Sequence, residues 1–178
     1  ELPLEPVLDV LAPATPPPHW TTTTVGVTET ALRGVLAELP ESERAGGLDL
    51  LVNSAGIGIA GRVEDAQVKH IDRQLAINLR GLVLVSQAAI PHLRETKRCI
   101  VNLPSIAGTQ PVPILPIYAA TKAAVISLTH SLNADLDDDG VRAIAICPGF
   151  VDTPMAEFAG LASDEMIQPE DCAEIVRM

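Results

Sequence analysis

The chain has 178 residues, a length that fits one domain and allows a sizeable core. Hydrophobic residues make up 47% and charged residues 20%, which excludes a disordered chain, and only 2% of residues are aromatic, which predicts an aliphatic core. The net charge of −11 argues against a nucleic acid or an anionic membrane as partner, because neither attracts an acidic surface.

The three cysteines are far apart in the sequence and form no CxxC or Cys/His cluster, so we expect no metal site. Cys99 and Cys147 lie at or in apolar runs, where a free cysteine behaves as a small hydrophobic residue. No apolar run is long enough to span a bilayer, and no basic region precedes an apolar segment at the N-terminus. Together these features predict a cytoplasmic protein in a reducing compartment.

Residues 1–24 contain six prolines and a run of four threonines, which predicts an irregular arm. The segment "PVLDVL" within it is alternatively a short strand. Residues 25–178 are predicted to form the folded domain. Its expected elements are a helix over 28–40, a strand over 48–53, two helices over 63–92 with a break near 76–81, a strand over 98–103, a helix over 117–140, a strand over 141–146 and a helix over 169–178.

Strands that alternate with helices indicate an α/β fold with a parallel sheet and right-handed crossovers. In such a sheet, ligands bind beyond the carboxyl ends of the strands. The three predicted strands are followed by "NSAG" (53–56), "PSIAG" (104–108) and "PGFVDT" (148–153). Each loop alone has a plain structural explanation, but the three together predict a binding site at one edge of the sheet.

Tyr118 and Lys122 are four residues apart on a predicted helix, so their side chains share a face. An ammonium group near a phenol favours the phenolate, and we therefore expect Lys122 to lower the pKa of Tyr118 and make it a proton-transfer group. The structural alternative is a core tyrosine beside a solvated lysine. Ser105 follows the preceding strand and is either an oxyanion stabiliser or a turn residue. Asn78 lies within a predicted helix and marks either a helix break or a surface position.

Together these residues resemble the short-chain dehydrogenase/reductase family from about Val25 to the C-terminus. "NSAG" is similar to the family's N-N-A-G segment, and "PGFVDT" is similar to its P-G-x-x-x-T element. The Asn-Ser-Tyr-Lys tetrad of the family matches Asn78, Ser105, Tyr118 and Lys122. The resemblance implies a Rossmann-like doubly wound sheet and hydride transfer between NAD or NADP and a carbonyl or secondary alcohol.

By this resemblance, Tyr118 is the acid/base, Lys122 holds the ribose hydroxyls, Ser105 orients the substrate oxygen and Asn78 holds a water in a proton relay. The implied cofactor-binding residues are Asn53, Ala55, Gly56, Tyr118, Lys122, Pro148, Gly149, Val151 and Thr153. The implied partners are a small carbonyl or alcohol substrate and a second copy of the chain, in a homo-dimer or tetramer.

The chain departs from the family at both ends. No T-G-x-x-x-G-x-G turn occurs in residues 1–47, and the residues up to 178 include no counterpart of the last strand of the family. The resemblance thus implies a chain without the first β-α-β unit and the last strand. The alternative function is a non-catalytic remnant of the family that serves as an oligomerisation or binding module.

Overall fold

The computed structural model describes residues 48–177. The arm expected over 1–24 and the helix expected over 28–40 lie outside the described residues. Within them, no helix combines the length and the hydropathy needed to cross a bilayer.

Three parallel strands form the sheet, in the order β1 (Leu50–Asn53), β2 (Cys99–Asn102) and β3 (Arg142–Ala145). The strands predicted from the apolar runs are thus confirmed, and with them the Rossmann-like α/β fold. Asn53 lies opposite Asn102, which lies opposite Ala145. Because the three strands end in register, the loops that follow them leave the sheet at one level.

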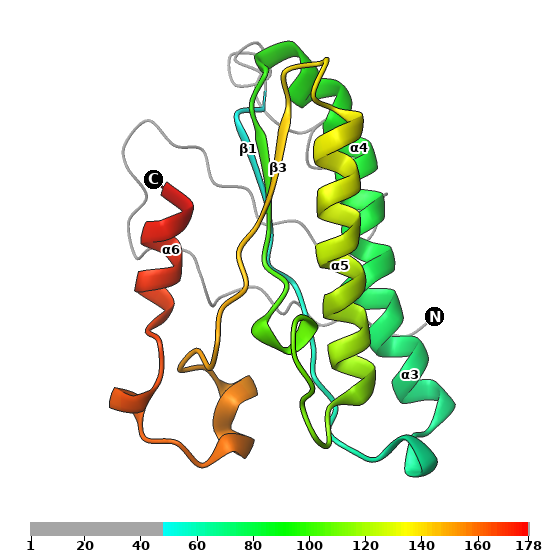
Figure 1. The fold of residues 1–178 in the computed structure, drawn as a ribbon, viewed down its shortest axis with the longest axis vertical. Helices are drawn as coiled ribbons and strands as arrows, with labels where there is room; N and C mark the ends of the chain where they lie inside the picture. Colours follow the sequence, from blue (N-terminus) through cyan, green and yellow to red (C-terminus); the bar gives the residue numbers. More distant parts are fainter. Residues whose placement is uncertain (1–47, 178) are drawn as a thin grey trace, which may run out of the picture.

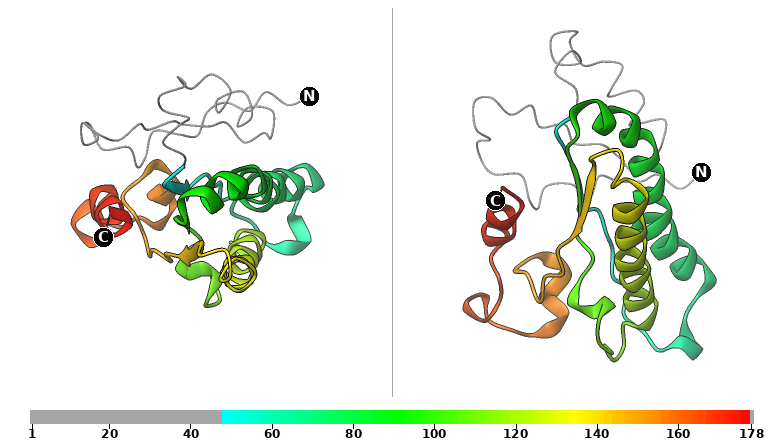
Figure 2. Two further views of the ribbon diagram at one scale, coloured as in Figure 1. Left: turned by 90° about the horizontal axis from the view of Figure 1, so that it is seen from above. Right: turned by 45° about the horizontal axis from the view of Figure 1, so that its top comes forward.

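The helices lie on two sides of this sheet. The principal helices are α3 (Val68–Leu75), α4 (Leu82–Thr96), α5 (Pro116–Asp135) and α6 (Pro169–Arg177), and the shorter turns are η1 (Val63–Asp65), η2 (Ala76–Gly81), η3 (Ile106–Gly108), η4 (Pro154–Ala159) and η5 (Ser163–Glu165). Helices α4 and α5 lie side by side against one face of the sheet, and α6 stands on the other side (Figures 1 and 2).

The helical segment expected over 63–92 differs from the prediction at both ends. It begins only at Val68, because Gln67 has an extended backbone and residues 63–65 form a separate short turn. It continues past Pro91 and ends at Thr96, where Lys97 adopts a left-handed conformation with φ of 53°. The break expected near 76–81 is a stretch of π-helix, η2, so the helix bulges there without being interrupted.

Helix α5 ends at Asp135, five residues before the predicted end at Gly140. The acidic segment that follows forms turns instead, and the Gly140 amide donates a hydrogen bond to the Asp137 carbonyl at 2.9 Å. Gly140 has a positive φ of 73°, a conformation that glycine adopts without strain. This turn lets the chain reverse and enter β3 directly.

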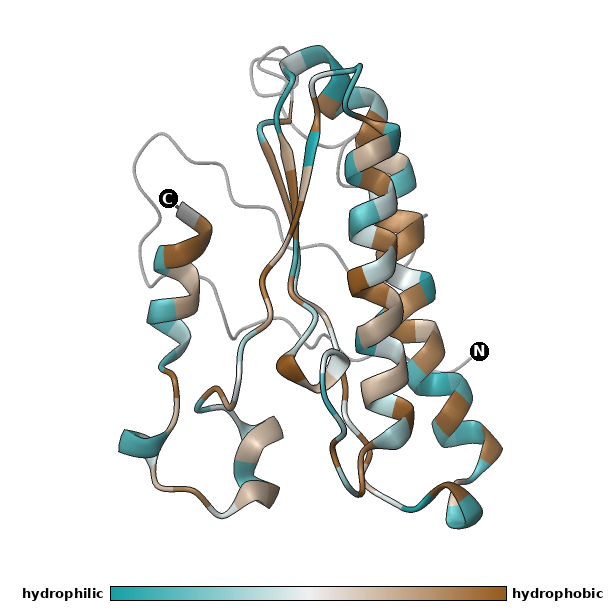
Figure 3. Ribbon diagram, viewed as in Figure 1, coloured by the Kyte–Doolittle hydropathy of each residue, from teal (hydrophilic) through white to brown (hydrophobic). Residues whose placement is uncertain are grey.

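The main core lies between the sheet and the helices α4 and α5. Its buried members are Ala89, Leu93, Ile100, Leu136, Val141 and Ala143. Hydrophobic residues run along the strands and recur on both helices (Figure 3). The core is aliphatic, as the composition predicts, so its stability depends on close packing of small side chains.

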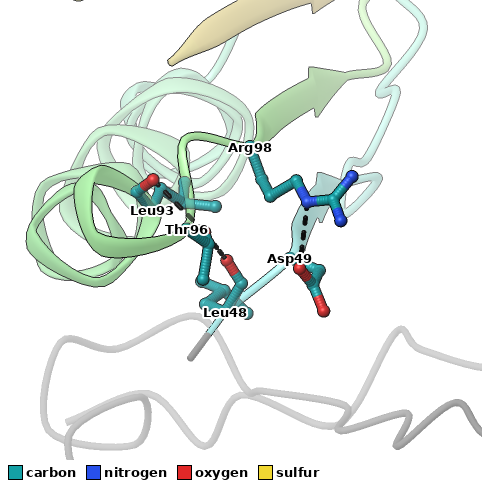
Figure 4. A network of polar contacts seen from close by, with 5 residues as sticks. All are labelled: Leu48, Asp49, Leu93, Thr96 and Arg98. Carbon is teal, nitrogen blue, oxygen red and sulfur yellow. Dashed lines mark hydrogen bonds and ion pairs between the residues drawn. The ribbon is translucent and has the colours of Figure 1, made fainter. Parts of the chain in front are cut away.

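Polar contacts fasten the start of β1 to the end of α4 (Figure 4). The Thr96 hydroxyl donates to the Leu48 carbonyl at 2.6 Å and lies 3.3 Å from the Leu93 carbonyl. The Arg98 guanidinium pairs with the Asp49 carboxylate at 3.1 Å. Both contacts lie at the amino ends of the strands, opposite the edge at which a ligand is expected.

Candidate active site

The loops that follow the three strands meet at the carboxyl edge of the sheet, at the lower end of the molecule in Figure 1. The amide of Ile106, in the loop after β2, donates to the carbonyl of Pro148, in the loop after β3, at 2.9 Å. The amide of Leu103 donates to the Asn53 carbonyl at the end of β1, also at 2.9 Å. Backbone hydrogen bonds thus link the three loops, and helix α5 begins beside them.

Tyr118 lies in the first turn of α5 and interacts with Ser105. The Ser105 hydroxyl accepts a hydrogen bond from the Ala107 amide at 3.1 Å, so its own proton can be donated to the Tyr118 oxygen or to a ligand. Burial raises the pKa of Tyr118 above its ordinary value of 10.0, and hydrogen bonding with the Ser105 side chain opposes this rise. The phenol is therefore protonated at neutral pH, which suits a general acid.

Lys122 is 5% exposed and lies one helical turn after Tyr118. Its Nζ donates to the Leu103 carbonyl at 3.0 Å and lies 5.5 Å from the centroid of the Tyr118 ring. Burial lowers the pKa of Lys122 from 10.5 to about 8, and the nearby Cys147 opposes this shift. Cys147 itself is exposed just beyond β3 and does not have the buried setting that the sequence predicts.

The expected lowering of the Tyr118 pKa by Lys122 is wrong for this structure, since the pKa of the phenol is raised. The physical reason is that Tyr118 loses its hydration by burial, while the Lys122 ammonium is held at the Leu103 carbonyl. The ammonium thus lies over the face of the ring. Electrostatic stabilisation of a phenolate from this position is weaker than the cost of desolvation.

Gly56 is buried and lies close against Lys122 and Asn78. A Cβ atom on Gly56 would lie 3.2 Å from Lys122 Nζ and 3.5 Å from Asn78 Oδ1, so any other residue would crowd the lysine. A Cβ on Gly58 would lie 3.5 Å from the Tyr118 ring. The ammonium and the phenol both donate hydrogen bonds, so a polyhydroxyl group such as a ribose is a suitable ligand for the pair.

Asn78 is 1% exposed and comes from the π-helical stretch η2. Its Oδ1 accepts from the Ile57 amide at 2.8 Å, and its Nδ2 donates to the Ile57 carbonyl at 2.9 Å. A third bond runs from Nδ2 to the Thr121 hydroxyl at 3.0 Å. Both polar atoms of the side chain are thus bonded to protein, and the role of Asn78 in holding a water stays a prediction.

Asn53 faces inward, although the resemblance implies that it binds the cofactor. Its Nδ2 donates to Asn102 Oδ1 at 2.8 Å and to Ser86 Oγ at 3.1 Å. Asn102 in turn donates to the Thr129 hydroxyl at 2.8 Å. This network joins the carboxyl ends of β1 and β2 to α4 and α5, next to the site. Sequence reasoning missed Asn102, although both apolar runs end in Val-Asn at equivalent positions.

The remaining predicted residues lie along the loop after β3. Pro148 and Gly149 are half-buried, and Pro148 accepts the hydrogen bond from Ile106. Val151 instead pairs with Ile167 in an isolated parallel bridge, and Thr153 precedes the short turn η4. The described contacts of Val151 and Thr153 are with this segment and not with Tyr118 or Lys122. Ala55 is half-buried beside Gly56.

Residues 21–163 match the family described as short chain dehydrogenase. Among curated proteins, an uncharacterized oxidoreductase of Staphylococcus epidermidis is 35% identical over 132 residues, which cover 74% of this chain and 57% of that protein. A counterpart from Staphylococcus aureus is 36% identical over the same length. The chain thus spans little more than half the length of these relatives.

Three solved structures extend the comparison. The serine dehydrogenase of Escherichia coli is 32% identical, with a TM-score of 0.72 over 84% of this chain and 64% of that chain. The 3-ketoacyl-(acyl-carrier-protein) reductase of Brucella melitensis, complexed with NADH, is 28% identical, with a TM-score of 0.75 over 85% of this chain and 66% of that chain. A closed form of a serine dehydrogenase with a similar score is complexed with NADP+.

Proposed function

Since the chain belongs to the short-chain dehydrogenase family, we propose that it takes part in hydride transfer between NAD or NADP and a carbonyl or secondary alcohol. The observation that carries the proposal is the meeting of Ser105, Tyr118 and Lys122 beside the glycine loop Gly56–Gly58. The bound NADH and NADP+ of the solved relatives support the choice of cofactor.

Tyr118 exchanges the proton of the reaction. When bound, the cofactor supplies or takes up the hydride. In the reducing direction, the carbonyl oxygen of the substrate gains the phenolic proton of Tyr118 as its carbon gains the hydride. In the oxidising direction, the alcohol proton returns to the phenolate. Ser105 donates its free hydroxyl proton to the substrate oxygen and holds it near the phenol.

Lys122 and the loop after β1 hold the ribose of the cofactor. The ammonium donates to the ribose hydroxyls from the side of α5, and Gly56 lies beside it on the loop after β1. Asn53 and Ala55 contribute from the same loop, and Pro148 and Gly149 contribute from the loop after β3. Val151 and Thr153 contribute from the segment that the bridge to Ile167 holds in place. The side chain of Asn53 also joins its loop to Asn102 at the end of β2.

The chain pairs with a second copy through the outer faces of its long helices. Leu75 and Val83 are 43% and 39% exposed on the continuous helix formed by α3, η2 and α4. They border a shallow apolar groove, and a second groove runs between α4 and α5 beside Leu128 and Leu132. Burial of these side chains against a second copy favours a homo-dimer or tetramer. We place this oligomer in the cytoplasm. Size-exclusion chromatography with light scattering tests this, with Val83→Lys expected to give monomers.

Cofactor binding tests the proposed function against the alternative of a non-catalytic module. The 178-residue chain is titrated with NADH and with NADPH, and the fluorescence of the reduced nicotinamide and the melting temperature of the protein are followed. We expect at least one of them to bind and to raise the melting temperature. The absence of a response to either at millimolar concentration would overturn the proposal.

Turnover tests the role of Tyr118. Tyr118→Phe removes the only proton that the phenol exchanges but keeps the ring against Gly58 and Lys122. We expect it to abolish carbonyl reduction while cofactor binding and the melting temperature stay close to those of the wild type. Turnover that survives in Tyr118→Phe would exclude Tyr118 as the acid/base.

A further inference from the structure

Thr121 is buried between α5 and the π-helical stretch η2, next in sequence to Lys122. It is 1% exposed. Its hydroxyl donates to the Tyr118 carbonyl at 2.7 Å and accepts from Asn78 Nδ2 at 3.0 Å. The hydroxyl proton and a lone pair are thus both used, one toward the helix that carries Tyr118 and one toward Asn78.

Asn78 connects Thr121 to the loop after β1. It binds both the amide and the carbonyl of Ile57, at 2.8 and 2.9 Å, in the way that a neighbouring strand would. Because Nδ2 also donates to Thr121, both of its N–H groups are bonded to protein, and the orientation of the Asn78 amide is fixed. The position of Ile57 therefore depends on the position of Thr121.

The residues on either side of Ile57 lie against the reacting side chains. Gly56 approaches Lys122 Nζ, and Gly58 approaches the Tyr118 ring, each closely enough that a Cβ atom would be in or near contact. The distance between this loop and α5 therefore determines how much water reaches the phenol and how much space remains beside the ammonium.

We propose that Thr121 is a positioning residue that, through Asn78, fixes the segment Gly56–Gly58 over Tyr118 and Lys122. The role in cofactor binding rests on the proposed function, whereas the role in burying the phenol does not. A threonine hydroxyl suits the task because its β-branched side chain has few rotamers in a helix, so the lone pair is held toward Asn78.

Thr129 provides a matched control two turns further along α5. It is also 1% exposed, donates to a carbonyl of its own helix (Val125, 2.7 Å) and accepts from a buried asparagine (Asn102, 2.8 Å). Removal of either hydroxyl therefore removes two buried hydrogen bonds of the same kinds, one donated to a helix carbonyl and one accepted from an asparagine. The Thr129 pair leads to Asn102 and Asn53 at the ends of the strands, whereas the Thr121 pair leads to Ile57, between the glycines that lie against Tyr118 and Lys122.

The test compares Thr121→Val, Thr121→Ser and Thr129→Val. Tyr118 is the only tyrosine of the chain, so the rise in tyrosinate absorbance after a rapid jump to high pH reports its ionisation alone. We expect Thr121→Val to lower the pKa of Tyr118 toward its ordinary value, because water reaches the phenol. Thr121→Ser and Thr129→Val should leave it at the wild-type position.

Cofactor binding is the second measurement. We expect Thr121→Val to bind the reduced cofactor about tenfold more weakly, which is the scale of one lost buried hydrogen bond, and Thr129→Val to bind it as the wild type does. If Thr121→Val does not fold, Thr121→Ala replaces it, since alanine places no methyl group against the Asn78 amide.

An unchanged Tyr118 ionisation in Thr121→Val would overturn the proposal, and so would an equal shift in Thr129→Val or in Thr121→Ser. A wild-type chain that binds no cofactor would overturn the proposed function alone, because the Tyr118 titration needs no cofactor and still decides whether Thr121 positions the loop.

Discussion

The Lys122 ammonium lies 5.5 Å from the centroid of the Tyr118 ring and gives its hydrogen bond to the Leu103 carbonyl. The lysine is therefore tied to the end of β2, and its charge meets the face of the aromatic ring. The proton transfer that we propose for Tyr118 would start from a protonated phenol, because burial raises its pKa, and a ligand beside Gly56 would have the ammonium as its neighbour.

The first prediction concerns the ionisation of Tyr118. Burial raises the pKa of the phenol, so its titration in the folded chain should fall above that of the same chain in denaturant, which should be about 10. Tyrosinate absorbance measures both. A midpoint in the folded chain at or below that of the unfolded chain would contradict the buried position of the phenol.

The second prediction concerns stability in mild alkali. The pKa of Lys122 is about 8 when folded and 10.5 in its ordinary state, so between these values the folded chain binds fewer protons than the unfolded chain. The free energy of unfolding should consequently rise with pH from about 8 to 10, by at most about 3 kcal/mol. Above this range the raised pKa of Tyr118 acts in the opposite direction.

Urea unfolding between pH 7 and pH 10 measures this rise. Lys122→Met should abolish it, since no buried amine then titrates. Lys69→Met, which removes an exposed lysine from α3, should keep it. A rise of equal size in Lys122→Met would mean that another group causes it.

The third prediction concerns Gly108, which packs the turn η3 directly onto α5. A Cβ atom there would lie 2.7 Å from the Lys122 carbonyl carbon and 2.8 Å from the Ala123 nitrogen. Both are backbone atoms, so Gly108→Ala must push η3 and Ser105 away from the helix, at a cost of about 1–3 kcal/mol. Chemical denaturation measures the loss.

Gly149→Ala is the control for this substitution, because the nearest atom to its added Cβ is Ile167 Cδ1 at 3.8 Å. It should leave the free energy of unfolding within about 0.5 kcal/mol of the wild type. Equal stability of the Gly108 and Gly149 variants would show that η3 does not press on α5.

The fourth prediction concerns Asn102, which is fully buried at the end of β2. Asn102→Ala removes the acceptor for Asn53 and the donor to Thr129, so we expect a loss of about 1–3 kcal/mol in the free energy of unfolding. Ser131→Ala, which removes an exposed hydroxyl bonded within α5, should change it little. A loss no larger than that of the serine control would contradict the network.

The strands were predictable because each is a short apolar run that ends in a polar or glycine-containing loop. Helix ends were less accessible to sequence reasoning. The helix continues past Pro91 although proline removes one amide donor, because Ala89 and Leu93 on either side of it are buried in the core. Helix α5 ends at Asp135, and turns lead from there to Gly140, which has a left-handed conformation. Such outcomes depend on the tertiary setting and not on local propensity.

Within the site, the spacing of Tyr118 and Lys122 indicated one shared helical face, which the helix α5 provides. The direction of the Tyr118 pKa could not be predicted, because it depends on burial of the phenol and on the Leu103 carbonyl that holds the lysine. The inward orientation of Asn53 likewise depends on Asn102, a partner almost fifty positions away.

The π-helical stretch has a consequence for how the sequence can change. At this stretch two adjacent pairs of residues are buried, Ile77 with Asn78 and Gly81 with Leu82. After it, the buried positions of α4 are the single residues Ser86, Ala89 and Leu93. A π-bulge is an α-helix with one residue added. Deletion of one residue here would restore an even helix but turn either the core face of α4 or the Asn78 face away from its partners, so this helix is constrained in its length as well as in its residues.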